Sequence, residues 1–166
     1  MPFRGHGWVS ESWWGATAPA TGPTGTTAIW TGLDFGIEVE GLIEGFRHYV
    51  AANNDGGQWG ILFDANTKEV LRGFHWRIRA DVSANAWHQT WIFPRLKHTD
   101  TNRRYRLATM RTTGQRFQTS NLLTSPVQHG NITFLNGWTS TALGIELANP
   151  TLTANAPGID VLFHAT

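Results

Sequence analysis

Apolar and polar side chains alternate along most of this chain, and this alternation constrains the fold more than any other feature. Between Gly73 and Val82 every second residue is apolar, with His, Arg and Asp between them; the apolar set is Phe74, Trp76, Ile78, Ala80 and Val82. A repeat of two residues is typical of a β-strand with one buried and one wet face. The sequence therefore predicts an all-β protein whose antiparallel sheets share a core.

Eight or nine short strands are predicted, separated by turn residues. The clearest strands span residues 33–40, 42–50, 59–63, 73–82, 87–93, 104–109, 132–135 and 159–163. Asn, Asp and Gly at 53–57 give the strongest turn signal, and Pro94 is expected to end a strand or mark an edge. Short strands at this spacing are typical of an antiparallel β-sandwich of the jelly-roll or immunoglobulin-like kind.

The chain length fits one domain with an additional arm. Its 166 residues are enough for a single packed core and short for two. Residues 1–28 are rich in Gly, Thr, Ala and Pro, which predicts an extended N-terminal arm and loop, whereas residues 29–166 predict a single sandwich domain. Trp8, Trp13 and Trp14 are candidate anchors of the arm on an assembly partner. The alternative is that they pack on the flank of their own domain.

Composition argues against several classes of function. A net charge of +1 does not provide the concentrated basic surface that nucleic-acid binding requires. The absence of cysteine removes disulfides, thiolate zinc sites and thiol nucleophiles together. No apolar run reaches the length of a membrane span or of the core of a signal peptide. We therefore expect no nucleic-acid partner and no membrane insertion.

A series of short motifs can be compared with known domains. They are Gly32 to Phe35, Gly41 to Tyr49, Gly60 to Ala65, Ala86 to Gln89, Tyr105 to Leu107 and Ile159 to Phe163. In order and spacing they resemble a family of β-sandwich domains of uncharacterised function, found in bacterial surface and secreted proteins beside glycan-processing or adhesive modules. The segment from Gln115 to Pro157 departs from the family pattern. The resemblance implies a non-catalytic module that binds or displays, with no catalytic residues to transfer.

Unlike the usual member of that family, this chain has its own Met1, a short arm and no export signal. A free-standing sandwich of this kind would suit a tailed bacteriophage, whose proteins assemble in the host cytoplasm and become extracellular after lysis. We therefore predict a non-enzymatic virion structural protein of the tail, tail tip or capsid surface. Its predicted partners are other virion proteins, copies of itself and a host-surface glycan. The alternatives are a soluble carbohydrate-binding module and, third, a glycoside hydrolase.

Glycan binding requires an exposed aromatic ring, on which the C–H groups of a sugar can stack, and nearby polar groups. Trp138 beside Asn136, or Trp87 with Trp91, are the candidates for this role. Trp59 and Trp76 fall on apolar strand faces, so we expect them to lie in the core.

A row of acidic residues could support the hydrolase hypothesis. Asp34 and Glu38 lie on one face of the predicted strand 33–40, with Glu40 and Glu44 close behind. Glycoside hydrolysis uses two carboxylates across a cleft. The favoured interpretation is that these carboxylates form the solvated face of an amphipathic strand.

Histidines and acidic residues give no recognisable metal motif. The seven histidines have none of the usual ligand spacings, although His75 and His88 could face each other on neighbouring predicted strands. Asp55 and Asp64, in predicted turns, could hold a structural calcium ion. Neither belongs to an EF-hand-type loop, so we predict no metal and no cofactor.

Arginines concentrate on two predicted strands and could form a basic patch; the interface candidates are Arg77, Arg79, Arg104 and Arg106. Such a patch could meet Glu38 and Glu40 on a second copy and give a self-assembly contact. The alternative, slightly favoured, is that Arg and acidic residues pair across strands within one domain.

Overall fold

The structure is a computed structural model that describes residues 10–12, 29–50, 56–78, 86–111, 119–120, 127–140, 151–153, 156–157 and 159–166. These residues form strands joined by turns and bends, with no helix among them. The same residues therefore contain no apolar helix of membrane-spanning length. The prediction of an all-β antiparallel protein is confirmed.

The described strands form two main sheets and one small pair. Their bounds are β1 Ile29–Ile37, β2 Gly41–Val50, β3 Gly56–Asp64, β4 Val70–Ile78, β5 Ala86–His98, β6 Arg104–Arg111, β7 Thr119–Ser120, β8 Val127–His129, β9 Ile132–Ser140, β10 Thr151–Thr153, β11 Ala156–Pro157 and β12 Ile159–Ala165. The larger sheet has the order β10-β9-β1-β6-β3-β4, with β8 paired to β9; the smaller has the order β12-β2-β5; β11 pairs with β7. All pairings are antiparallel.

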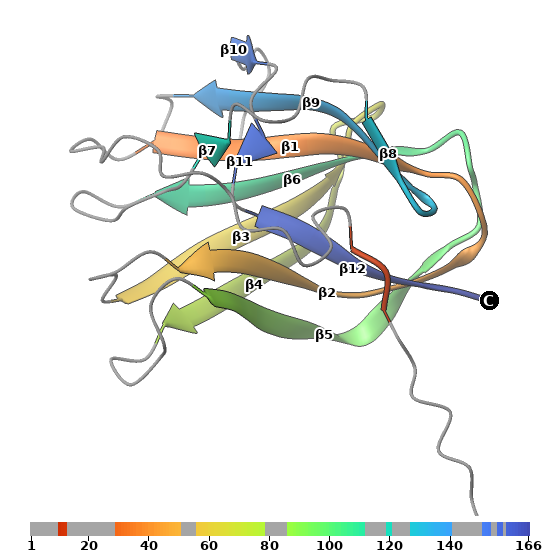
Figure 1. Cartoon of the computed structure of the whole chain (residues 1–166), viewed down its shortest axis with the longest axis horizontal. Coiled ribbons are helices and arrows are strands. Elements are labelled where there is room, and N and C mark those ends of the chain that lie inside the picture. The colour runs from red at the N-terminus through yellow and green to blue at the C-terminus, as the bar shows by residue number, and fades with distance from the viewer. Residues whose placement is uncertain are drawn as a thin grey trace, which may run out of the picture.

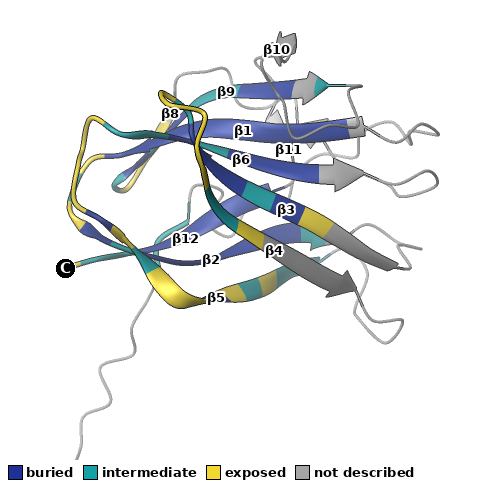
Figure 2. Cartoon of the chain, turned by 180° about the vertical axis from the view of Figure 1, so that it is seen from behind, coloured by how far each residue is buried: buried dark blue, intermediate teal, exposed yellow. Residues whose placement is uncertain are grey.

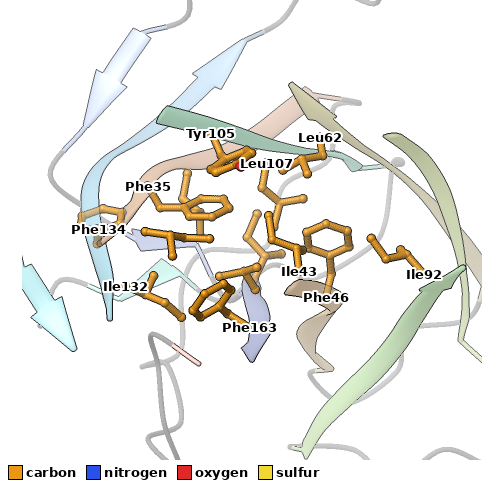
Figure 3. Packing of buried hydrophobic residues seen from close by; sticks show 14 residues of the cluster. Phe35, Ile43, Phe46, Leu62, Ile92, Tyr105, Leu107, Ile132, Phe134 and Phe163 are labelled. Carbon is orange, nitrogen blue, oxygen red and sulfur yellow. The ribbon is translucent and has the colours of Figure 1, made fainter. Parts of the chain in front are cut away.

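The two main sheets form two layers with the core between them (Figure 1). Figure 3 shows Phe35 and Tyr105 from the larger sheet facing Ile43, Phe46 and Phe163 from the smaller. The rings of Phe35 and Tyr105 stack with centroids 5.3 Å apart. These side chains are buried because alternate residues of each strand point inward, as the sequence pattern predicts.

A buried polar group lies at one end of this core. The Nδ1 of His98 is 2.7 Å from the Tyr105 hydroxyl, and its Nε2 is 3.1 Å from the Ile37 carbonyl oxygen. Burial lowers the pKa of His98 and raises that of Tyr105, so the neutral forms are favoured. A neutral His98 donates from Nε2 to the carbonyl and accepts the Tyr105 hydroxyl proton at Nδ1, which satisfies both ring nitrogens.

Several predicted strand boundaries differ from those of the structure. The strand predicted at 33–40 runs instead from Ile29 to Ile37, because the chain leaves the larger sheet there and enters the smaller one at Gly41. The strand predicted at 87–93 continues to His98, and Pro94 lies in an edge strand, the second of its two predicted alternatives. The strand predicted from residue 73 begins at Val70, and residues 79–85 lie outside the described part of the chain.

A short N-terminal segment, residues 10–12, lies beside the free edge of β12 (Figure 1). Glu11 exchanges two backbone hydrogen bonds with Phe163, of 2.6 and 2.9 Å. Its carboxylate accepts bonds from the backbone N and Nδ2 of Asn131, at 2.9 and 2.7 Å, at the turn before β9. The segment thus ties the smaller sheet to the larger one. The predicted boundary between arm and domain at residue 28 stays a prediction.

Candidate functional site

An irregularity between β2 and β5 shapes the candidate site. Ile43 pairs with Leu96 and Gly45 pairs with Trp91, so the single residue Glu44 lies opposite the whole stretch 92–95. Because β5 is at the edge of its sheet, these extra residues can bulge outward without disturbing a further strand. Proline is tolerated at such a place because a bulged edge strand needs fewer backbone donors. The result is a locally exposed aromatic segment in an otherwise paired strand.

The bulge borders a hollow of about 530 Å³, which we call the β5 hollow; it is lined by Ser10, Glu44, Trp91, Phe93 and Arg95. Trp91 is 47% exposed and Phe93 is 78% exposed, whereas most side chains of β2 and β12 are buried. Figure 2 shows this contrast, with exposed stretches on β5 beside the buried β2 and β12. Two aromatic rings are therefore available to a ligand at one place.

The polar part of the β5 hollow is an ion pair. The carboxylate of Glu44 is nearly buried, and its Oε1 lies 3.0 Å from Nη1 of Arg95, whose side chain is 48% exposed. The hydroxyl of Ser10 donates to Oε2 of Glu44 at 2.5 Å. A buried carboxylate requires such partners because desolvation is otherwise costly. The hollow thus combines apolar rings with a compensated charge.

A hydrogen bond from the larger sheet restrains the bulge of β5. Arg72 of β4 donates from Nη2 to the backbone oxygen of Pro94 at 3.1 Å. Since β4 and β5 are the edge strands of different sheets, this bond joins the two layers beside the hollow. It fixes the position of the segment that carries Phe93 and Arg95.

Trp87 lies on the same strand as Trp91 but is engaged within the domain. The guanidinium carbon of Arg47 is 4.3 Å from the centre of its ring, and Tyr49 meets it edge to face with centroids 5.5 Å apart. The ring also packs against the main core. Trp87 therefore supports the sheet and does not line the β5 hollow.

The expectation that Trp138 is an exposed platform is wrong. Its side chain is 0% exposed and packs with Trp30, Phe63 and Ala108 in a second apolar cluster. Its ring covers Gly32, where a Cβ would overlap it. Asn136, the neighbouring candidate, pairs with Asp34 in the same sheet and is half-buried.

The strand predicted at 132–135 continues to Ser140, so Trp138 lies in β9 and not beyond its end. A β-bulge in this strand sets the face that Trp138 occupies. Phe35 pairs with Phe134 and Asp34 pairs with Asn136, so the ladder skips Leu135. An extra residue in one strand reverses which face the following side chains occupy. Phe134 therefore points into the main core, whereas Trp138 points to the opposite face of the larger sheet.

Trp59 is a second correction. The alternation of residues 59–63 predicts a core position, yet its side chain is 56% exposed. It lies on β3 near the edge strand β4 and does not line the β5 hollow. Nothing is described of the side chain of Trp76, and Trp8, Trp13 and Trp14 lie outside the described residues.

The charge candidates are divided between internal pairs and the surface. Arg106 donates through Nε and Nη2 to the two carboxylate oxygens of Asp34, both at 2.7 Å. Arg104 donates to the backbone oxygen of Thr101 at 3.0 Å. These contacts favour pairing within the domain. The side chain of Arg77 and the whole of Arg79 lie outside the described part of the chain.

The acidic candidates do not form the predicted row. Glu38 and Glu40 are exposed on the connection between the sheets, and Glu38 accepts a 3.0 Å bond from Thr133. Asp34 belongs to the larger sheet and Glu44 to the smaller. The strand face that would have carried Asp34 and Glu38 together does not exist, because β1 ends at Ile37.

The described residues contain no group of three or more metal-ligating side chains. Asp64 accepts bonds from the backbone N of Asn66 and Thr67 and pairs with Arg103 at 3.1 Å, so it stabilises a turn. Asp55 lies outside the described residues.

The predicted facing of His75 and His88 is wrong, because β4 and β5 lie in different sheets. His88 pairs instead with His48 on β2, with ring centroids 6.2 Å apart. Burial, and to a smaller extent electrostatic repulsion by the neighbouring imidazole of His88, lowers the pKa of His48 to about 3.

Of the predicted glycan-binding residues, only Trp91 lines the β5 hollow. Sequence reasoning missed Phe93, Arg95 and Ser10, and it placed Glu44 in the acidic row. A signal was present, since Trp91, Phe93 and Arg95 occupy alternate positions around Pro94 and the mixed aromatic and basic set is unusual for a core face. In comparisons with known proteins, no family model and no curated protein sequence matches this chain.

Proposed function

We propose that this protein is a non-enzymatic structural component of a bacteriophage virion surface that contacts a saccharide at the β5 hollow. The observation that carries the binding part is the exposure of Trp91 and Phe93 beside the Glu44–Arg95 ion pair. Aromatic faces favour the C–H surface of sugars, and a few fixed polar groups give orientation. The virion setting rests on the sequence resemblance and on the predicted arm.

The two-sheet frame suits this role because it holds the ligand-contacting segment without closing over it. Ile43 and Phe46 are buried in the core on either side of Glu44, and Ile92 of the bulge is buried as well, so the bulged segment is anchored to the core. The hydrogen bond from Arg72 to the backbone oxygen of Pro94 restrains β5. A restrained segment loses little conformational entropy on binding, which favours affinity.

A soluble carbohydrate-binding module would use the same hollow, so binding alone does not separate the two proposals. The distinguishing property is location. A virion component sediments with purified particles and assembles with copies of itself or other virion proteins, whereas a soluble module stays in the supernatant.

The binding proposal is tested with the purified protein on immobilised host-surface glycans. Trp91→Ala and Phe93→Ala each remove one ring of the hollow, and we expect either to weaken binding about tenfold or more. Trp59→Ala is the matched control, since it removes an exposed tryptophan that does not line the hollow. If all three variants bind as the wild type does, the hollow is not the binding site. Immunodetection in sedimented particles tests the virion setting separately.

A further inference from the structure

The charge of the β5 hollow is balanced by its own side chains. Glu44 supplies one negative charge at the floor, and Arg95 supplies one positive charge 3.0 Å away. Among the other lining residues, Ser10, Trp91 and Phe93 carry none. A ligand therefore meets a dipolar floor with no net charge.

The remaining hydrogen-bonding capacity of this floor suits hydroxyl groups. The carboxylate of Glu44 is only 4% exposed and already accepts from Ser10 and Arg95. A guanidinium has five N–H donors, and the side chain of Arg95 is 48% exposed. A sugar hydroxyl is neutral and accepts a hydrogen bond, so it can bond to Arg95 without displacing Glu44.

An anionic sugar fits this floor poorly. Its carboxylate would compete with Glu44 for the same guanidinium and would bring a second negative charge close to the first. Like charges placed together at a desolvated contact are strongly unfavourable. Glu44 thus cancels the attraction that Arg95 alone would have for an acidic ligand.

We propose that the β5 hollow selects neutral over anionic saccharides and that Glu44 is the residue that sets this preference. The inference rests on the proposed saccharide binding and names the ligand class for the same site. It makes Glu44 a specificity-determining residue whose effect acts through Arg95.

The test uses an array of immobilised oligosaccharides in which each neutral member has a counterpart of the same linkage with a C6 carboxylate. We expect the wild type to bind neutral members about tenfold more tightly than their acidic counterparts, or by a larger factor. Glu44→Gln keeps the shape but leaves Arg95 uncompensated, and we expect it to reverse the ratio. The double variant E44Q/R95Q removes both charges and is expected to lose the gain in acidic binding.

Glu38→Gln is the matched control, because it removes an exposed carboxylate outside the hollow and should leave the ratio unchanged. Thermal unfolding establishes that each variant is folded. If Glu44→Gln alone does not fold, the double variant still tests the inference, because without both charges the preference for neutral members should be lost. Acidic members bound as tightly as neutral ones, or a ratio unaffected by Glu44→Gln, would overturn the inference while saccharide binding stands. No binding to any member would overturn the proposed saccharide binding as well.

Discussion

Two parts of the molecule contain the same three kinds of side chain in opposite settings. On the larger sheet, Trp138 lies near Arg106, which is paired with Asp34; we call these three residues the sealed set. At the edge of the smaller sheet, Trp91 lies in a hollow with the Arg95–Glu44 pair. The tryptophan is 0% exposed in the sealed set and 47% exposed in the β5 hollow. Residue type alone therefore does not distinguish a packing contact from a binding site.

Position in the sheet accounts for the difference. The sealed set lies on β1, β6 and β9, which are adjacent inner strands, so each of its side chains has neighbours on both sides. Trp91 and Arg95 lie on an edge strand that bulges away from its single partner in the sheet. Trp138 is therefore covered by its neighbours and contributes to packing, whereas Trp91 on the bulged edge remains available to a ligand.

The largest expected effect comes from Trp138→Ala. This change removes a fully buried ring and leaves a cavity above Gly32, which we expect to cost about 3–5 kcal/mol of unfolding free energy. Urea denaturation followed by tryptophan fluorescence measures it. A cost as small as that of Trp91→Ala would mean that Trp138 is accessible to solvent, and the contrast in burial between the sealed set and the β5 hollow would be lost.

Acid pH is expected to destabilise the folded protein through its buried histidines, which exposed side chains would not do. His48 is neutral in the folded protein because its pKa is lowered to about 3, whereas in the unfolded chain it takes up a proton below about pH 6.5. Stability is therefore lost as the pH falls from about 6.5 toward 3, at about 1.4 kcal/mol per pH unit for this group. The buried His98 contributes in the same direction.

Urea midpoints measured between pH 7 and pH 4 test this prediction. His48→Gln should reduce the slope of stability against pH. An unchanged slope in His48→Gln would show that the imidazole is hydrated in the folded protein.

The sequence predicts where the strands lie better than it predicts which face of a sheet each side chain occupies. Alternation correctly identified the inward positions of Phe35, Phe46 and Val161. Trp138 was placed beyond the strand predicted at 132–135, whereas β9 continues through a bulge at Leu135 to Ser140. The strand predicted at 87–93 likewise continues through a bulge to His98. Bulges depend on the partner strand, and a single strand's pattern does not contain that information.

The candidate site was predictable only in part for the same reason. Trp91 was identified as one of the aromatic rings on which a sugar could stack. Its neighbours in the hollow were not, since Ser10 and Glu44 are brought to Arg95 by the pairing of β2 with β5 and by the N-terminal segment on β12. The contact of Arg106 with Asp34 likewise depends on the register of β1 and β6, which converts a predicted surface charge into an internal pair.

Asp34→Asn tests the ionic part of the sealed set. It leaves the guanidinium of Arg106 without its anionic partner in a largely buried position, and we expect a loss of about 2 kcal/mol in unfolding free energy. Glu38→Gln, an exposed carboxylate on the neighbouring connection, should change stability by no more than about 0.5 kcal/mol. Equal effects of the two changes, measured by thermal or urea unfolding, would place Asp34 in effectively hydrated surroundings.

The smallest effect on stability is expected at Phe93, in the exposed β5 hollow. Phe93→Ser removes a ring that is 78% exposed, and the loss of so little buried area should change the unfolding free energy by no more than about 0.5 kcal/mol. Because the same ring forms part of the β5 hollow, saccharide binding should fall about tenfold or more while the fold is retained. A large loss of stability on urea denaturation would show that Phe93 is covered in solution. The aromatic surface would then belong to the packing of the domain, and the distinction between the β5 hollow and the sealed set would disappear.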